Sequence, residues 1–143
     1  MRKLAIAIDG PAGAGKSSVA KILAANMGYA YLDTGAMYRA VTYEVLRREL
    51  TEEKDIVALA AGMDMTVKPE ADTMHVIVNG HDVTDHIRTP EVSARVSAVS
   101  ALAGVRAAMV EIQRRQAAKG GIVLDGRDIG TTVLPVSYTH LRA

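Results

Sequence analysis

The sequence predicts an α/β fold built around a parallel sheet. An apolar run, Leu4–Ile8, leads through a glycine-rich turn directly into a stretch with helical periodicity. Two more short apolar runs follow later, Tyr29–Asp33 and Ile122–Leu124; an Asp closes the first and comes directly after the second. Strands that alternate with helices in this way are typical of parallel sheets covered by helices.

The turn after the first strand, Gly10–Ser17, matches the pattern G-x-x-x-x-G-K-S. A helix follows it and ends near Gly28; its apolar residues recur at helical spacing and are Val19, Ile22, Leu23 and Met27. In this setting backbone N–H groups point inward at the positive end of the helix dipole, which makes a nest for phosphate oxygens. The alternative, a glycine-rich turn that matches by chance, is disfavoured by the flanking strand and helix.

The pattern assigns a role to each of its polar side chains. We expect Lys16 to reach the β- and γ-phosphates of a nucleoside triphosphate and the Ser17 hydroxyl to hold Mg²⁺. The residues expected to bind the nucleotide cofactor are Gly10, Pro11, Ala12, Gly13, Ala14, Gly15, Lys16, Ser17 and Ser18.

The second strand, Tyr29–Asp33, ends in a turn in which Thr34 is expected to cap the next helix. That helix is predicted over about 36–50, and its buried stripe consists of Met37, Val41 and Val45. Arg39 lies off this stripe and is free to point at a ligand, although a solvated surface Arg fits the spacing equally well. A further helix is predicted over 51–61.

The stretch 63–100 has a different texture. Residues 63–68 alternate as a half-buried strand does, 74–78 form a second strand, and Asn79-Gly80 is a strong turn signal before a short strand at 81–83. Thr89-Pro90 predicts the start of a helix. We therefore expect a small hairpin-plus-helix insertion between core elements.

The third core strand follows a helix predicted over 104–119 and leads into Asp125-Gly126-Arg127-Asp128. A carboxylate at the end of a strand beside the glycine turn can hold Mg²⁺, directly or through water, which gives Asp125 that role. Arg127 can bind a phosphate with two parallel hydrogen bonds, and Asp128 can accept from a substrate amino group or hydroxyl. A surface Arg–Asp pair is the alternative for these last two residues.

Composition limits the classes of function. The 143 residues suffice for one domain, and the net charge of +1 argues against nucleic acid polymers and anionic membranes as partners. The chain has no Cys, its four His lack ligand spacing, and no apolar run approaches membrane-spanning length. Because Met1-Arg2-Lys3 leads straight into the first strand, we expect no signal peptide and a cytoplasmic location. We also expect the chain to be a monomer.

Together these patterns favour phosphoryl transfer from a nucleoside triphosphate. Two polyanions must approach each other when the acceptor is itself phosphorylated, so such a site needs a cluster of cations. The arginines available for this cluster are Arg39, Arg88, Arg106 and Arg127.

With these residues in view, the chain resembles the bacterial cytidylate kinases. The runs that carry the resemblance are 8–17 (IDGPAGAGKS), 32–39 (LDTGAMYR), 87–89 (IRT) and 124–131 (LDGRDIGT). It covers about residues 2–135 and implies a P-loop nucleoside monophosphate kinase, with a three-layer core and an enlarged monophosphate-binding insertion. It also implies transfer of the ATP γ-phosphate, with Mg²⁺, to CMP or dCMP, giving CDP or dCDP.

The resemblance also implies roles for single residues. Thr34, Arg39 and Arg127 would hold the acceptor nucleotide, chiefly by its phosphate, and Arg88 is a further candidate. The positions that match those for the cytosine ring are Ser97, Arg106 and Asp128. The residues expected to act in catalysis are Lys16, Asp125 and Arg127. Ser18 stands where the family often has Thr, which leaves the Ser17 hydroxyl in place.

The resemblance stops at Pro135, and residues 136–143 do not look like the family's continuation. We expect core segments at 1–62 and 101–135, the insertion at 63–100 and a foreign tail at 136–143 on a truncated chain. The first strand would then be a sheet edge, and the family's arginine-rich lid would be missing, so the chain would be weakly active or inactive.

Two other functions fit the sequence less well. A kinase of a small metabolite such as shikimate would want a carboxylate pair after the second strand, where this chain has Thr34-Gly35. The other alternative is a non-catalytic nucleotide-binding fragment or a chain that does not fold, and the missing strands and lid are the argument for it.

Overall fold

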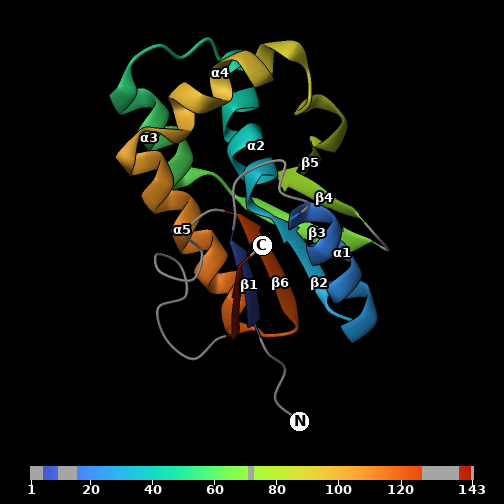
Figure 1. Ribbon diagram of the computed structural model, residues 1–143. Coiled ribbons are helices and arrows are strands. Elements are labelled where there is room, and N and C mark those ends of the chain that lie inside the picture. Colours follow the sequence, from blue (N-terminus) through green and yellow to red (C-terminus); the bar gives the residue numbers. More distant parts are fainter. Residues whose placement is uncertain (1–4, 10–15, 71–72, 127–138, 143) are drawn as a thin grey trace. The chain divides into compact units, whose positions relative to one another are not determined.

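The computed structural model describes residues 5–9, 16–70, 73–126 and 139–142 (Figure 1). In chain order its elements are β1 (Ala5–Asp9), α1 (Lys16–Met27), β2 (Ala30–Asp33), α2 (Thr34–Arg47), α3 (Glu53–Gly62), β3 (Met65–Glu70), β4 (Thr73–Val78), β5 (His81–Asp82), the 3₁₀ helix η1 (Thr84–His86), α4 (Pro90–Ser100), α5 (Ala103–Ala118), β6 (Ile122–Gly126) and β7 (Thr139–Arg142). Both the α/β class and the parallel core sheet are as expected from the sequence.

The chain divides into two compact units. The first consists of residues 1–34, 69–74 and 110–143, and the second of residues 35–68 and 75–109. The second unit therefore takes in nearly all of α2, the whole of α3 and α4 and the start of α5, as well as most of the stretch 63–100. The monophosphate-binding role expected for that stretch stays a prediction.

The first unit contains the parallel sheet, in the order β2-β6-β1-β7. β6 lies between β2 and β1 and pairs in parallel with both. These three strands are the three apolar runs of the sequence, and their side chains are almost entirely buried, as expected for a parallel sheet.

The expectation that β1 forms a sheet edge is wrong. Thr139–Arg142 forms β7, which pairs in parallel with β1 from Ile6 to Asp9. An edge strand presents a row of unpaired N–H and C=O groups, and an extended segment that reaches it gains those hydrogen bonds. The foreign origin expected for residues 136–143 stays a prediction.

α1 packs on the sheet through a different face from the one expected. It contacts β6, β2 and β1, and its buried residues are Ala20 and Ala24, with Leu23 packed against the same cluster. Three of the four apolar residues singled out by spacing are instead exposed: Val19 by 51%, Ile22 by 62% and Met27 by 38%. Small side chains let the helix approach the strands closely, so Ala20 and Ala24 form the buried contact face, and Leu23 is the only one of the four expected residues that packs beside them.

In the second unit, several local expectations are confirmed. α2 buries Met37, Val41 and Val45, each fully. α4 begins with Pro90 in its first turn, and the side chain of Thr89 accepts a hydrogen bond from the Val92 N–H. β3, β4 and β5 form a three-stranded sheet, with Asn79-Gly80 at the turn between β4 and β5.

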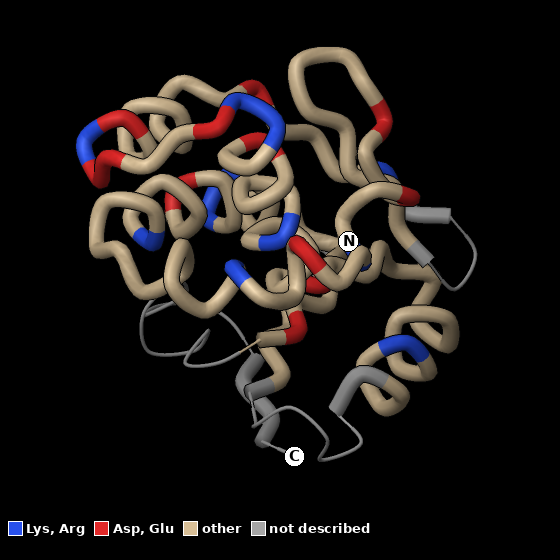
Figure 2. The backbone as a smooth tube through the Cα atoms, turned by 90° about the horizontal axis from the view of Figure 1, so that it is seen from above, with Lys and Arg blue, Asp and Glu red and all other residues tan. Residues whose placement is uncertain are grey.

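Neither the charge nor the hydropathy of the described residues singles out one surface of the protein. Figure 2 shows both signs of charge interspersed along the described chain, in keeping with the net charge of +1. Among the described residues, no single helix has the length and apolar composition to cross a membrane. α4 and α5, which meet at a bend of 97°, satisfy that test only when they are taken together.

Close packing of α3 and α5 predicts the effect of a single methyl group. A Cβ added at Gly104 would lie 2.5 Å from Cγ1 of Val57, a stiff β-branched side chain. Gly104→Ala should therefore lower the free energy of unfolding by about 1–3 kcal/mol, although Ala is the better helix former. Urea denaturation measures the change.

Two further variants separate the clash from helix propensity. Gly62→Ala adds a methyl group where nothing lies within 4 Å, so it should leave the stability unchanged or raise it. In a Val57→Ala background, Gly104→Ala should no longer destabilise. A loss of stability that persists in that background would contradict the packing explanation.

The β4–β5 hairpin carries a hydrogen-bonded cluster on its surface. Thr84 donates to Oδ1 of Asp82 from its hydroxyl, at 2.6 Å, and from its N–H, at 2.9 Å. Nδ1 of His75 lies 2.7 Å from Oδ2 of the same carboxylate. These contacts, led by the Thr84 hydroxyl, lower the pKa of Asp82 from 3.8 to about 2.

This pKa gives a testable pH dependence. Because the pKa of Asp82 is lower in the folded state than in the unfolded state, the ionised carboxylate stabilises the folded state. This contribution is complete above about pH 4 and is lost as the pH falls toward 2. Thr84→Val should move the Asp82 pKa back toward 3.8, measured by carboxyl ¹³C NMR titration, because the main donor is removed. Thr66→Val, on the exposed face of β3, should leave it unchanged, and an ordinary Asp82 pKa in the unaltered protein would refute the assignment.

Candidate functional site

The carboxyl ends of β1, β2 and β6 meet at one edge of the parallel sheet. Ile8 of β1 is in register with Asp125 of β6, and Asp33 of β2 is in register with the same residue. The chain leaves β1 at this edge, and α1 begins at Lys16. The strand and helix expected on either side of the glycine-rich turn are thus confirmed, and β6, the strand that carries Asp125, lies beside the first strand as expected.

Part of the expected cofactor site lies outside the residues that the structure describes. Gly10, Pro11, Ala12, Gly13, Ala14 and Gly15 lie outside the described residues, as do the side chains of Lys16 and Ser17. Arg127 and Asp128 also lie outside the described residues. Ser18 is exposed on the first turn of α1. The roles of all these residues stay predictions.

Asp125 is a buried carboxylate held by a specific donor. Only 3% of the residue is exposed, and its Oδ2 accepts a hydrogen bond of 2.9 Å from the hydroxyl of Tyr31. Side chains alternate along a strand, so Asp125 shares a face of β6 with Val123, which belongs to the core cluster beneath α1. The carboxylate therefore lies on the face of the sheet that α1 covers.

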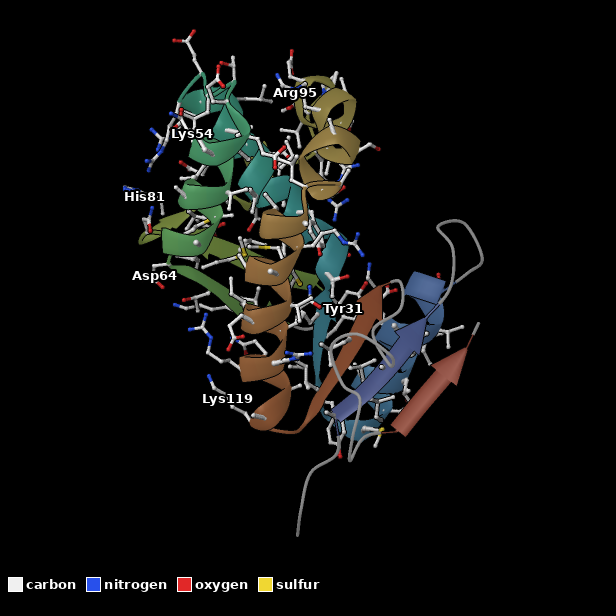
Figure 3. All side chains as sticks on the ribbon, turned by 90° about the vertical axis from the view of Figure 1, so that its left-hand side faces the viewer. Tyr31, Lys54, Asp64, His81, Arg95 and Lys119 are labelled. Carbon is white, nitrogen blue, oxygen red and sulfur yellow. The ribbon has the colours of Figure 1, made fainter. Side chains whose placement is uncertain are left out.

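Tyr31 is the residue of this site that the sequence analysis missed. It lies on β2 within the parallel sheet (Figure 3), is 7% exposed, and packs in the core cluster beneath α1. The Nζ of Lys21, on α1, lies 5.7 Å from the centre of its ring. Tyr29 and Tyr31 alternate with Ala30 and so share one face of the strand, but the register that brings the Tyr31 hydroxyl to Asp125 is a tertiary feature.

Thr34 takes a different role from the cap that was expected. α2 begins at Thr34, two residues earlier than predicted, and its hydroxyl donates to the main-chain carbonyl of Asp125 at 2.9 Å. Within the described residues its side chain accepts no capping hydrogen bond. Since Thr34 is 5% exposed, this bond ties the start of α2 to the end of β6. Its expected contact with the acceptor nucleotide stays a prediction.

Within the second unit, Arg39 is half-buried on α2 and points toward the start of α4. Its Nη1 donates to the main-chain carbonyl of Ile87 at 3.3 Å and to the hydroxyl of Ser93 at 3.0 Å. The alternative of a purely solvated surface arginine is therefore wrong for this residue. Ser93 was not among the residues that the sequence singled out.

Three other residues of this unit are expected to bind the substrate, and the side chains of all three are exposed. One lies before α4, one on α4 and one on α5. They are Arg88, Ser97 and Arg106. The charge of Arg106 acts on Tyr38 of α2: burial raises the pKa of the Tyr38 hydroxyl above 10.0, and Arg106 acts in the opposite direction. The two side chains, one on α2 and one on α5, are therefore within electrostatic range of each other. The contacts of Ser97 and Arg106 with cytosine stay predictions.

Loss of the Tyr31 hydroxyl should weaken the fold. Tyr31→Phe keeps the ring in the core and removes one donor to a buried carboxylate, so the free energy of unfolding should fall by about 1–3 kcal/mol. Chemical denaturation followed by circular dichroism measures this change. Tyr43→Phe is the matched control, because the ring of Tyr43 stacks on His86 and its hydroxyl makes no hydrogen bond within the described residues. Equal stabilities of the two variants would show that the Tyr31–Asp125 bond contributes nothing.

Comparison with known proteins gives one consistent family. The family model described as cytidylate kinase matches residues 6–140. The cytidylate kinase of Desulfitobacterium hafniense is 52% identical over 136 residues, which are 94% of this chain and 58% of that protein. The cytidylate kinase of Bacillus subtilis is also 52% identical over 136 residues, covering 94% of this chain and 61% of the relative. That of Limosilactobacillus fermentum is 51% identical over 137 residues, 94% and 60% of the two chains.

These relatives are longer than the chain, which spans about 58–61% of their length. The match runs through both compact units, since it begins in β1 and reaches β7. The family model thus matches most of the chain, and identity to these relatives is near 50% over 94% of it. The chain belongs to the cytidylate kinase family.

Proposed function

We propose that this chain carries the site at which the γ-phosphate of ATP is transferred to CMP or dCMP, giving CDP or dCDP. The observation that carries the proposal is the buried carboxylate of Asp125, on the α1 face of β6 and in register with the end of β1. A carboxylate in that place, next to a glycine-rich turn that opens a helix, is the arrangement that phosphoryl-transfer enzymes of this kind use. The relatives are named cytidylate kinases, and this name indicates the acceptor nucleotide.

The donor half of the proposal concerns ATP and Mg²⁺. The backbone of residues 10–15 would surround the phosphates, Lys16 would neutralise their charge, and Ser17 and Asp125 would supply hydroxyl and carboxylate oxygens to the metal. Oxygen ligands of this type suit Mg²⁺, which when bound draws charge from the transferring phosphoryl group. Tyr31 donates to Oδ2 of Asp125 and so fixes the orientation of that carboxylate.

The acceptor half concerns the nucleoside monophosphate. Thr34, Arg39 and Arg127 would bind its phosphate, with Arg88 as a further cation, because arginine matches phosphate with parallel hydrogen bonds. Ser97, Arg106 and Asp128 would recognise cytosine, whose exocyclic amino group needs an acceptor and whose ring nitrogen and carbonyl need donors. Arg127 would also act on the transferring group.

Binding and turnover need separate tests, because the relatives contain a region that this chain does not span. The Mg²⁺ preference, a monomeric state and a cytoplasmic location complete the proposal, and sedimentation of the purified chain tests the second of these. A non-catalytic nucleotide-binding chain is the second candidate, favoured by the 58–61% coverage of the relatives.

The first experiment is a thermal melt of the 143-residue chain with and without CMP. At about a hundred times the dissociation constant, CMP should add about 2.7 kcal/mol of stability, a shift of several degrees. AMP and shikimate at the same concentration should shift the transition less. An equal shift with AMP would contradict a cytosine-selective site.

A second measurement then asks whether the bound nucleotide reacts. Formation of CDP from CMP and ATP with Mg²⁺, at stoichiometric protein concentration, would establish turnover by this chain. Selective CMP binding without CDP would instead support the non-catalytic candidate.

A further inference from the structure

The contacts of Arg39 use only one end of its guanidinium group. Both hydrogen bonds start at Nη1, one to the Ile87 carbonyl and one to the Ser93 hydroxyl. Nη1 carries two N–H donors, so these bonds account for both. Within the described residues, neither Nη2 nor Nε has a hydrogen-bond partner. The edge of the guanidinium formed by Nε and Nη2 is therefore available to a ligand.

Both acceptors that hold Nη1 are fixed by the local structure at the start of α4. Ile87 follows η1 directly and is 1% exposed, so its main chain is anchored by a buried side chain. Ser93 lies in the first turns of α4, where its N–H donates to the carbonyl of Thr89 at 3.0 Å. Thr89 caps this helix, and Pro90 begins it. The direction of the Arg39 side chain is thus set by a capped helix start.

The free edge has the geometry that a phosphate needs. Nε–H and one Nη2–H are parallel and form the fork that binds two oxygens of one phosphate. An arginine that is already held in one orientation loses less conformational freedom when the anion binds than one that moves freely. Ser93 contributes to this only by holding Arg39, since it is a neutral side chain at the other end of the group.

We infer that Ser93 is a positioning residue for the acceptor phosphate: with the Ile87 carbonyl it holds Nη1 of Arg39, so that the Nε–Nη2 edge faces the phosphate of the nucleoside monophosphate. This inference rests on the proposed function, in which Arg39 binds that phosphate. It adds a residue that does not itself touch the nucleotide.

The test compares two β-branched variants at position 93 in the 143-residue chain. Ser93→Thr keeps the hydroxyl, whereas Ser93→Val has nearly the same shape without it. Dissociation constants of CMP and of cytidine are measured by calorimetry, and thermal melts verify that both variants fold; the position is exposed, so either substitution is accommodated. Ser93→Val should weaken CMP binding about threefold, an effect at the lower end of the range for one hydrogen bond because Ser93 is exposed and acts only through Arg39, and Ser93→Thr should restore it.

Two controls distinguish positioning from a structural effect. Cytidine has no phosphate, so its affinity should be the same for both variants. Ser100→Ala removes another hydroxyl from α4, one that donates to the Ser97 carbonyl, and should leave CMP affinity unchanged. In an Arg39→Ala background, the difference between Thr and Val at position 93 should disappear.

The outcomes separate this inference from the proposed function. If the unaltered chain does not bind CMP, the proposed function fails and the inference fails with it. If Arg39→Ala weakens CMP binding while the two variants at position 93 bind equally, the proposed function stands and the role of Ser93 is refuted. A threefold difference that persists without Arg39, or that cytidine also shows, likewise refutes positioning through Arg39.

Discussion

Parallel pairing of β6 with both β1 and β2 is the constraint on which the candidate site depends. Parallel strands end at the same edge, so one register brings the end of β1, the end of β2 and Asp125 together. Ligands of open α/β sheets bind at such carboxyl ends, where helices and loops leave the strands. A shift of one residue in β6 would turn Asp125 to the other face, away from α1, and would replace Val123 in the core cluster. The apolar packing of the sheet and the placement of the carboxylate are therefore one requirement.

The buried carboxylate also explains why a tyrosine lies in the core beneath α1. Removing a carboxylate from water is unfavourable unless hydrogen bonds replace its hydration, and the Tyr31 hydroxyl supplies one at 2.9 Å. The ring contributes apolar surface to the cluster with Ile8 and Ala24, while its hydroxyl serves the charged group. Thr34, which directly follows β2, donates to the main-chain carbonyl of Asp125. The group that we propose as a metal ligand is thus held by residues that also stabilise the fold.

Much of the fold follows from local patterns, and the failures share one physical origin. The buried strands, the stripe of α2 and the Thr89-Pro90 helix start are set by burial and capping within a few residues, so the sequence predicts them. The contact face of α1 was mispredicted because close approach to the sheet selects Ala20 and Ala24, and this depends on the neighbouring strands. The pairing of β7 with β1 joins segments more than a hundred residues apart, and no local pattern encodes it. Tyr31 and Ser93 were not predicted from the sequence for the same reason, because each acts through a partner distant in sequence.

Arg39 shows how a helix cap can determine the direction of a side chain that lies on another helix. The spacing of α2 places this arginine off the buried stripe but leaves its direction undefined. Its direction is set by the junction between η1 and α4, where a buried isoleucine and a capped helix start place a carbonyl and a hydroxyl within reach of Nη1. The cap at Thr89 is readable from sequence, and Ser93 follows it by four residues, which is one helical turn. A neutral residue can therefore orient a charged one. The pattern consists of a hydroxyl one turn after a helix cap and, opposite to it, an arginine that lies off the buried stripe of another helix.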